Sequence, residues 1–251
     1  MGHELSYFLC ATPRSGTTML CDLLAATGRA GRPQSYFRRQ DIERRARGYG
    51  LRANDFAHSR DFDRAYLDAV LREGAGDSGI FGLRIMWGTV AEMAERLSAL
   101  RPDLRDAELF ESLFGRIVYV HVSRGDKVAQ AISLLKAELS GLWHVAADGS
   151  ERQRTAPPAR PSYDPDRIAE LVGELEQDEA SWNAFFAANE IAPVRIEYEA
   201  LAAAPRVELQ KILVGLNLPA ELADAVEVRT SKMADAESGA WADRFRRARG
   251  A

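Results

Sequence analysis

The chain has 251 residues, of which 46% are apolar and 28% are charged. This length favours one large α/β domain over two small ones, and the apolar share excludes a wholly disordered chain. Lysine and arginine total 33 against 37 acidic residues. The resulting net charge of −4 argues against a protein that coats nucleic acid or an anionic membrane, since both partners require a basic surplus.

The chain opens with a predicted strand, a loop and a helix. Residues 5–11 form a short apolar run that ends at Thr12-Pro13, which is typical of a buried strand entering a tight loop. Apolar residues then recur with helical spacing over 17–26, before the stop signal Thr27-Gly28. The loop 12–18 joins the two elements.

The middle of the chain alternates between strands and helices. Residues 29–77 are charged and poorly periodic, and only 62–72 predicts an amphipathic helix there. The clearest strand is 116–122, whose β-branched and aromatic residues suit a central parallel strand. Asp126 is placed to cap the helix that follows it. The other elements predicted here are a strand over 80–87 and helices over 92–100 and 127–139.

The last third begins with a break in this pattern, where composition predicts a mobile loop at about 145–165. The elements expected after it are a long helix from 165 or 166 to 189, a strand over 194–198, and helices over 207–215 and 237–249. Strands alternating with helices predict an α/β fold with a mainly parallel sheet covered on both faces. We expect a single domain over residues 1–251.

The first residues of the chain and its cysteines indicate in which cellular compartment we expect the protein. The first residues lack the basic region of a signal peptide, and no apolar run approaches the roughly 18 residues of a membrane span. We therefore expect a cytoplasmic protein without a membrane span. Cys10 and Cys21 fall inside apolar segments and match neither a disulfide framework nor a metal site, so we expect buried thiols.

The loop 12–18 is the sharpest chemical feature of the sequence. A strand that turns through Gly16 into a helix presents backbone N–H groups and the positive helix end to one spot, which suits phosphate. The side chains of Arg14, Ser15, Thr17 and Thr18 add further donors. An ordinary glycine turn with capping hydroxyls is the alternative. The Walker A pattern is absent, which disfavours an ordinary nucleotide triphosphatase.

A second candidate anion site follows the strand 116–122. Arg124 stands at its end, and Ser133 lies nine residues later in the predicted helix. A parallel sheet brings the carboxyl ends of its strands to one edge, where ligands bind, so Arg124 and Arg14 are expected to face one cleft. Two such sites suggest a ligand with two separated phosphates. A surface arginine and an ordinary helix serine are the alternative.

These segments resemble a known family. Residues 13–18 are similar to the 5′-phosphosulfate loop of sulfotransferases that use 3′-phosphoadenosine 5′-phosphosulfate (PAPS), and 124–133 to their 3′-phosphate motif. The resemblance to bacterial carbohydrate sulfotransferases extends over most of the chain. It includes 26–28, 31–37, 82–87, 232–235 and 241–246.

This resemblance implies a P-loop-like three-layer fold, PAPS as the sulfuryl donor, no metal, and in-line transfer to a hydroxyl of a carbohydrate or glycolipid. It is also compatible with a homodimer. Arg124 and Ser133 would hold the 3′-phosphate, and Lys232 would add charge to the nucleotide site. The residues that would hold the 5′-phosphosulfate are Arg14, Ser15, Gly16, Thr17 and Thr18. Arg14 would also stabilise charge on the departing nucleotide.

One departure from the family concerns the catalytic base. In the bacterial carbohydrate sulfotransferases that this chain resembles, a glutamate that is read as the base stands where this chain has Ser35. A serine hydroxyl cannot take a proton near neutral pH without help, so either the base lies elsewhere or the acceptor differs. His144 is one candidate base, and His58 and Asp41 are others. His121, inside the apolar strand, is expected to be a core histidine.

The candidate acceptor-binding residues lie on two of the motif segments. Arg32 replaces another family glutamate, and Arg84 stands where the family often has lysine. Tyr36 and Trp87 are predicted to stack on a sugar or an aromatic acceptor, with ordinary core packing as the alternative.

Two other functions stay open. A nucleotide-binding member without transferase activity is compatible with Ser35. A small-molecule kinase is disfavoured because position 14 is arginine and the strand 116–122 leads into Ser123-Arg124, not an acidic residue for magnesium.

Overall fold

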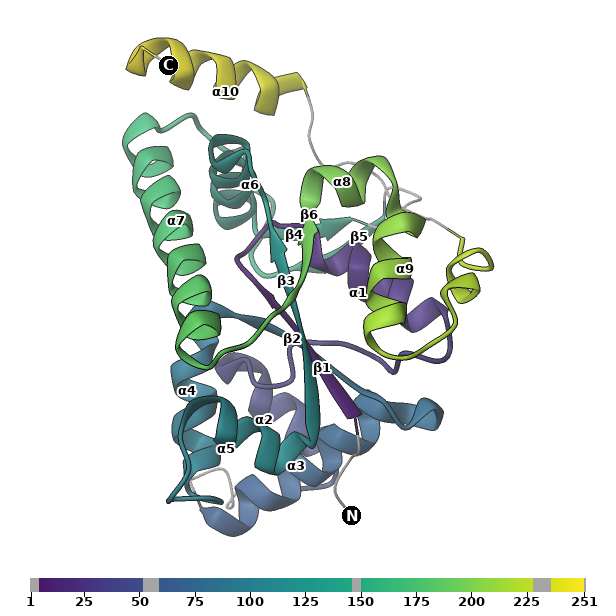
Figure 1. Cartoon of the computed structure of the whole chain (residues 1–251). Helices are drawn as coiled ribbons and strands as arrows, with labels where there is room; N and C mark the ends of the chain where they lie inside the picture. Colours follow the sequence, from purple (N-terminus) through teal and green to yellow (C-terminus); the bar gives the residue numbers. More distant parts are fainter. Residues whose placement is uncertain (1–4, 52–58, 146–149, 228–235, 251) are drawn as a thin grey trace.

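The computed structural model describes residues 5–51, 59–145, 150–227 and 236–250. Four parallel strands form the central sheet in the order β2–β1–β3–β6 (Figure 1). Each strand lies where the sequence predicts one. Their bounds are β1 Leu5–Ala11, β2 Phe81–Met86, β3 Arg116–Ser123 and β6 Val194–Glu197. Ala11 pairs with Val122, so β1 and β3 end side by side at one edge of the sheet.

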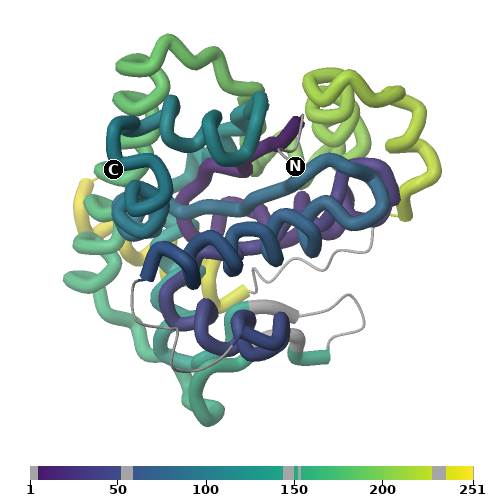
Figure 2. Tube along the Cα trace, turned by 90° about the horizontal axis from the view of Figure 1, so that it is seen from below, coloured from purple at the N-terminus to yellow at the C-terminus, as the bar shows by residue number. Residues whose placement is uncertain are grey.

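Side chains alternate between the two faces of β1 and build two separate cores. Phe8 and Cys10 pack in the core that α3 and α5 cover, whereas Tyr7 and Leu9 pack in the core on the opposite face. Helices α1 and α9 cover that second face. Figure 2 shows α3 and α9 on opposite sides of the strands. The molecule is therefore three-layered, with helices on both faces of a parallel sheet, which confirms the predicted fold class.

The predicted helices are present, with some changes of length. The bounds are α1 Thr17–Ala26, α3 Arg60–Ala75, α4 Trp87–Ser98, α6 Lys127–Ser140, α7 Pro165–Ala188, α9 Pro205–Gly215 and α10 Ala236–Arg249. Helix α4 begins at Trp87, well before the predicted residue 92, because Gly88 and Thr89 weaken the helical signal of its first turn. Asp126 caps α6 as predicted, since its side chain accepts a hydrogen bond of 3.0 Å from the amide of Ala129.

Three helices have no counterpart in the sequence predictions: α2 Arg39–Gly48, α5 Asp106–Phe114 and α8 Tyr198–Ala203. Helix α2 is highly charged and buries only Ile42 and Ala46. Two apolar positions are too few to reveal a helical repeat in the sequence. Two short 3₁₀ turns, η2 Gly76–Ser78 and η3 Ala220–Ala223, complete the helical elements of the described residues.

The expected loop at 145–165 is partly structured. Strand β4, Leu142–Val145, pairs in antiparallel fashion with β5, Glu151–Arg154, and residues 146–149 between them lie outside the described residues. Trp143 Nε1 donates a hydrogen bond of 2.9 Å to Thr155 Oγ1, which ties the pair together. The loop prediction was wrong for β5, because polar composition alone does not reveal a strand held by pairing.

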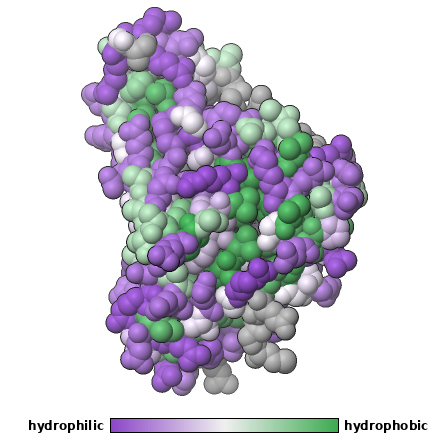
Figure 3. Space-filling view, viewed as in Figure 1, coloured by the Kyte–Doolittle hydropathy of each residue, from purple (hydrophilic) through white to green (hydrophobic). Residues whose placement is uncertain are grey.

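Helix α10 returns the carboxyl end of the chain to α6 and α7. Trp241 and Phe245 of α10 pack with Leu135 of α6 and Leu171 of α7 in a third apolar cluster. The face that Figure 1 presents is mostly hydrophilic over α7 and α10, with apolar side chains gathered over the middle of the sheet (Figure 3). No helix among the described residues is long and apolar enough to cross a membrane.

Candidate nucleotide and acceptor site

The loop after β1 wraps the amino end of α1. Gly16 occupies the N-cap of α1 with φ 85°, a left-handed conformation that glycine adopts without strain, and no side chain caps the helix there. The first backbone N–H groups of α1 thus begin at this loop. Ser15 is fully buried, and its hydroxyl donates to the carbonyl of Thr12 at 2.8 Å. Ser15 therefore shapes the loop in this structure, and its hydroxyl does not point outward.

Arg14 spans from this loop to helix α6. Its Nε donates a hydrogen bond of 3.0 Å to Ser133 Oγ, and its Nη1 donates to the carbonyl of Trp143 in β4. Its backbone also has positive φ, 64°, which is uncommon outside glycine. Two of the predicted phosphate residues, Arg14 and Ser133, are thus in direct contact although they come from different motifs.

Arg124 follows β3 and touches the same loop from the other side. Its Nη1 donates a hydrogen bond of 3.1 Å to the carbonyl of Arg14, and its guanidinium lies 4.4 Å from the ring centre of Tyr198. Its Nε is buried and has no hydrogen-bond partner among the described residues. A buried donor without a partner is costly, so this nitrogen is suited to receive an acceptor atom of a ligand.

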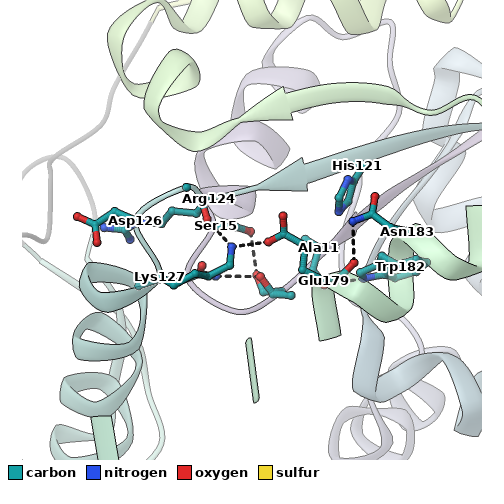
Figure 4. A network of polar contacts seen from close by, with 12 residues as sticks. Ala11, Ser15, His121, Arg124, Asp126, Lys127, Glu179, Trp182 and Asn183 are labelled. Carbon is teal, nitrogen blue, oxygen red and sulfur yellow. Dashed lines mark hydrogen bonds and ion pairs between the residues drawn. The ribbon is translucent and has the colours of Figure 1, made fainter. Parts of the chain in front are cut away.

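The loop and Arg124 are held by residues behind them. Gln130 of α6 is fully buried, and its Nε2 donates to Thr12 Oγ1 at 2.8 Å and to the Pro13 carbonyl at 2.6 Å. Figure 4 shows Lys127 between Arg124 and Glu179 of α7, donating to the carbonyl of Arg124 while it pairs with the carboxylate. The two strand-end loops are therefore anchored to α6 and α7.

The electrostatics of the two arginines favour an anion. Burial is the largest cause that lowers the pKa of Arg14 to about 10, and the neighbouring charge of Arg124 is the next. The pKa of Arg124 is also lowered, again mainly by burial. Both side chains remain charged near neutral pH, and an anion between them would offset their mutual repulsion. The donors here fit the phosphate groups of a bisphosphate nucleotide.

A second cluster joins the same loop to residues 31–37, the segment predicted to bind the acceptor and called the acceptor segment below. Arg84 of β2 donates from Nε to Ser35 Oγ at 2.9 Å and from Nη1 to Thr18 Oγ1 at 3.0 Å. The oxygen of Ser35 accepts from a guanidinium, which opposes its acting as a proton acceptor. This hydrogen bond makes Ser35 still less suited to act as a base than the low basicity of its hydroxyl already implies.

Three residues predicted to bind the acceptor do not form an exposed binding surface. Tyr36 is fully buried, its hydroxyl donates to the carbonyl of Arg32, and its ring packs near Phe81, so its prediction as a stacking surface was wrong. Trp87 packs edge-on against Trp182 with ring centres 5.0 Å apart and is half-buried.

Arg32 lies at the other end of its segment. Its side chain is next to Gly76, which precedes β2, and its amide donates to the carbonyl of Gly74. Because β2 runs from that end toward the ligand edge, Arg32 is on the far side from the loop. Its prediction as an acceptor-binding residue is therefore not supported by its position.

Several other candidates are not brought to the site, or cannot be placed. Lys232 and His58 lie outside the described residues, and only the backbone of His144 is described. Asp41 forms an ion pair with Arg44 within α2. His121 is buried as expected.

The sequence reasoning missed three residues that support the loops. These are Gln130, Tyr198 and Glu199, the last of which accepts hydrogen bonds of 3.2 Å from the amides of Gly125 and Asp126. Tyr198 and Glu199 directly follow β6, so the rule that ligands gather at strand ends could have found them. No cluster of three potential metal ligands occurs among the described residues.

Comparison with known proteins assigns the chain to a family. It is 27% identical over 258 residues to a trehalose 2-sulfotransferase of Mycobacterium tuberculosis (96% of this chain, 94% of the relative). It is 25% identical to that of Mycolicibacterium smegmatis (98% and 96%). A solved sulfotransferase domain from the curacin biosynthetic pathway shares the fold, with TM-score 0.50 and 18% identity over 93% of this chain and 82% of the domain. The model of the Stf0 sulphotransferase family matches residues 6–248, and the chain belongs to this family.

Proposed function

We propose that the protein transfers the sulfuryl group of PAPS to a hydroxyl of a carbohydrate or glycolipid acceptor. The family supports sulfuryl transfer, and the named relatives act on a sugar. The observation that carries the proposal is the direct contact of the two predicted phosphate motifs. Arg14 reaches Ser133 of the second motif, and Arg124 reaches the carbonyl of Arg14 in the first.

Each motif has a separate role in this proposal. The amides at the start of α1, with Arg14 and Thr18, bind the 5′-phosphosulfate. Arg124 and Ser133 bind the 3′-phosphate, and the unpartnered Nε of Arg124 supplies one of the donors. Gln130 keeps the first loop in place by holding Thr12 and Pro13. PAPS supplies an activated sulfuryl group when it is bound.

The reaction is a displacement at sulfur. A new bond forms from the acceptor oxygen to sulfur as the bond from sulfur to the phosphate oxygen breaks, and the bonding pair of that bond stays on the phosphate. The acceptor hydroxyl gives up its proton to a base or to solvent water. Arg14 and the helix amides are suited to stabilise the charge that grows on the departing oxygen, because fixed donors in a buried site need no reorganisation during the reaction.

The test is the binding of adenosine 3′,5′-bisphosphate measured by calorimetry. We expect wild type to bind and Arg124→Ala to lose about 10- to 100-fold in affinity, the range for a hydrogen bond to a charged group. Arg44→Gln, on the exposed side of α2, is the matched control and should bind like wild type. A wild type that fails to bind, or an Arg124→Ala variant that binds undiminished, contradicts the nucleotide assignment. Transfer of label from PAPS to a panel of sugars and glycolipids then tests the acceptor class.

A further inference from the structure

The side chain of Arg84 connects the donor loop to the acceptor segment. Its two hydrogen bonds go to Thr18, at the start of α1, and to Ser35, in the segment that follows Gly31. Both partners are neutral hydroxyls, and all three side chains are half-buried and so still open to solvent. The guanidinium therefore lies at the junction where donor and acceptor would meet.

The charge of Arg84 is not balanced by the protein. No carboxylate among the described residues lies within 4.0 Å ion-pair distance of it, and its Nη2 has no hydrogen-bond partner there. Two half-buried arginines outside the site differ: Arg96 pairs with Asp63, and Arg45 with Glu73. A partly desolvated guanidinium with only neutral partners is suited to bind an external anion, and its fork fits a carboxylate.

The three residues Arg84, Thr18 and Ser35 include no group suited to take a proton. Ser35 and Thr18 both accept hydrogen bonds from Arg84, and arginine stays protonated in proteins. The proton that the acceptor hydroxyl releases has no acceptor among these three residues. This proton therefore leaves to water or to a group outside these three residues.

We propose that the acceptor is an acidic sugar whose carboxylate binds Arg84 beside the hydroxyl that is sulfated. This inference rests on the proposed sulfotransferase function. The carboxylate pairs with the open Nη2 edge of Arg84, which orients the hydroxyl toward the donor loop. The hydroxyl proton leaves to solvent water as the oxygen–sulfur bond forms.

The donor phosphosulfate is the other anion that could satisfy Arg84. Arg14, Arg124 and the α1 amides already serve the donor in the proposed function, whereas Arg84 is the arginine that contacts Ser35. Assignment of Arg84 to the acceptor and assignment to the donor predict different defects in an Arg84 variant. Loss of acceptor recognition indicates the acidic sugar, and loss of nucleotide affinity indicates the donor.

The experiment compares the methyl glycosides of glucuronic acid (the glucuronide) and of glucose (the glucoside), which carry a carboxylate and a hydroxymethyl group at C6, and scores sulfation at the ring hydroxyls that both sugars share. We expect wild type to sulfate the glucuronide with a kcat/KM at least 10-fold higher. Arg84→Gln should lose at least 10-fold more with the glucuronide than with the glucoside, mainly through KM, because any effect through Thr18 and the donor loop is common to both sugars. Its affinity for adenosine 3′,5′-bisphosphate should stay within 3-fold of wild type. Arg84→Lys should recover part of the glucuronide activity, and Arg44→Gln should match wild type.

A charge placed on the partner residue gives an independent test. Ser35→Glu puts a carboxylate within reach of Arg84, so we expect it to weaken calorimetric binding of the glucuronide at least 10-fold. Binding is the readout because a glutamate at position 35 is also the family's base and affects the turnover of both sugars. Equal use of both sugars by wild type, or a loss in Arg84→Gln shared by both sugars and by bisphosphate affinity, overturns the acidic acceptor. So does wild type that binds the bisphosphate but shows no calorimetric binding of the glucuronide. Failure to bind the bisphosphate instead overturns the proposed function itself.

Discussion

Arg14 and Ser133 are 119 positions apart, yet the arginine Nε donates a hydrogen bond of 3.0 Å to the serine hydroxyl. This contact ties the loop after β1 to helix α6. Arg14 Nη1 donates a second hydrogen bond to the Trp143 carbonyl, and the two contacts together fix the orientation of the guanidinium. In the proposed function Ser133 therefore has two roles, as a donor to the 3′-phosphate and as a support for Arg14.

Removal of this support gives the first prediction. Ser133→Ala should weaken adenosine 3′,5′-bisphosphate binding by about 10-fold, since one hydrogen bond that involves a charged group is worth roughly 1.5 kcal/mol or more. Calorimetry measures the loss. Ser112→Ala removes a helical hydroxyl that bonds only within α5 and serves as the control. Equal affinities for the two variants would show that the Arg14 contact has no role in binding.

Gly16 gives a second prediction, with Gly28 as its matched control. Both have positive φ, 85° and 65°, so alanine strains the backbone at either position by about 1 kcal/mol. A Cβ at Gly16 would lie 2.7 Å from Tyr198 Cδ2, whereas nothing lies within 4 Å of one at Gly28. The clash at Gly16 must displace the ring that supports Arg124.

We therefore expect Gly16→Ala to lower both the thermal midpoint and the affinity for adenosine 3′,5′-bisphosphate. Gly28→Ala should lower the midpoint alone. A nucleotide affinity that falls equally in both variants, or in neither, contradicts the role assigned to the close approach of Tyr198 to the loop.

The sequence allows the sheet and the first loop to be predicted because their signals are local. Strands β1 and β3 are continuous apolar runs, and Gly16 marks the turn into α1. Helix α2 escapes prediction because it buries two residues only, and β5 because its pairing with β4 is what stabilises it. Elements held by tertiary contacts leave a weak trace in the local pattern.

The candidate site was predictable in its motifs but not in its contacts. Arg14, Arg124 and Ser133 were named from the sequence, whereas nothing in the spacing reveals that Arg84 bonds both Thr18 and Ser35. The burial of Tyr36 was equally hidden, since an aromatic residue beside a motif suits either a binding face or the core. Side-chain direction after a turn depends on the packing of distant elements.

Asp126 links the Arg124 loop to helix α10 and yields a third prediction. Its carboxylate caps α6 and accepts two hydrogen bonds of 2.8 Å from Arg246 Nη2. Burial tends to raise its pKa, but the Ala129 amide and Arg246 outweigh this and lower it. Asp126→Ala should cost about 1 kcal/mol or more for the cap, whereas Arg246→Gln should cost less than about 1 kcal/mol, because the pair is exposed.

Urea unfolding of the two variants checks this order, and Asp126→Asn, which can still cap α6, should resemble Arg246→Gln. If Arg246→Gln proves as costly as Asp126→Ala, the ion pair, and not the cap, dominates the contribution of Asp126.

His121 gives a prediction for the pH dependence of stability. The ring is 2% exposed, and Arg195 Nη1 donates to its Nδ1 at 3.0 Å, so the neutral ring carries its proton on Nε2. Burial is the main cause that lowers the pKa of His121 from 6.5 to about 4, with the charges of Arg195 and Lys127 adding to it and Glu179 opposing it. The unfolded chain therefore binds more protons than the folded one between these two values.

The stability from the neutral ring is complete above pH 6.5 and is lost as the pH falls toward 4. Its full size is at most about 3.5 kcal/mol, from roughly 1.4 kcal/mol for each pH unit between the two pKa values. Urea unfolding at a series of pH values should show wild type losing more stability than His121→Gln between pH 6.5 and 4.5. Carboxylates titrate in both proteins and cancel in the difference. Parallel stability curves for the two proteins would mean that His121 is not kept neutral by burial between β3 and α7.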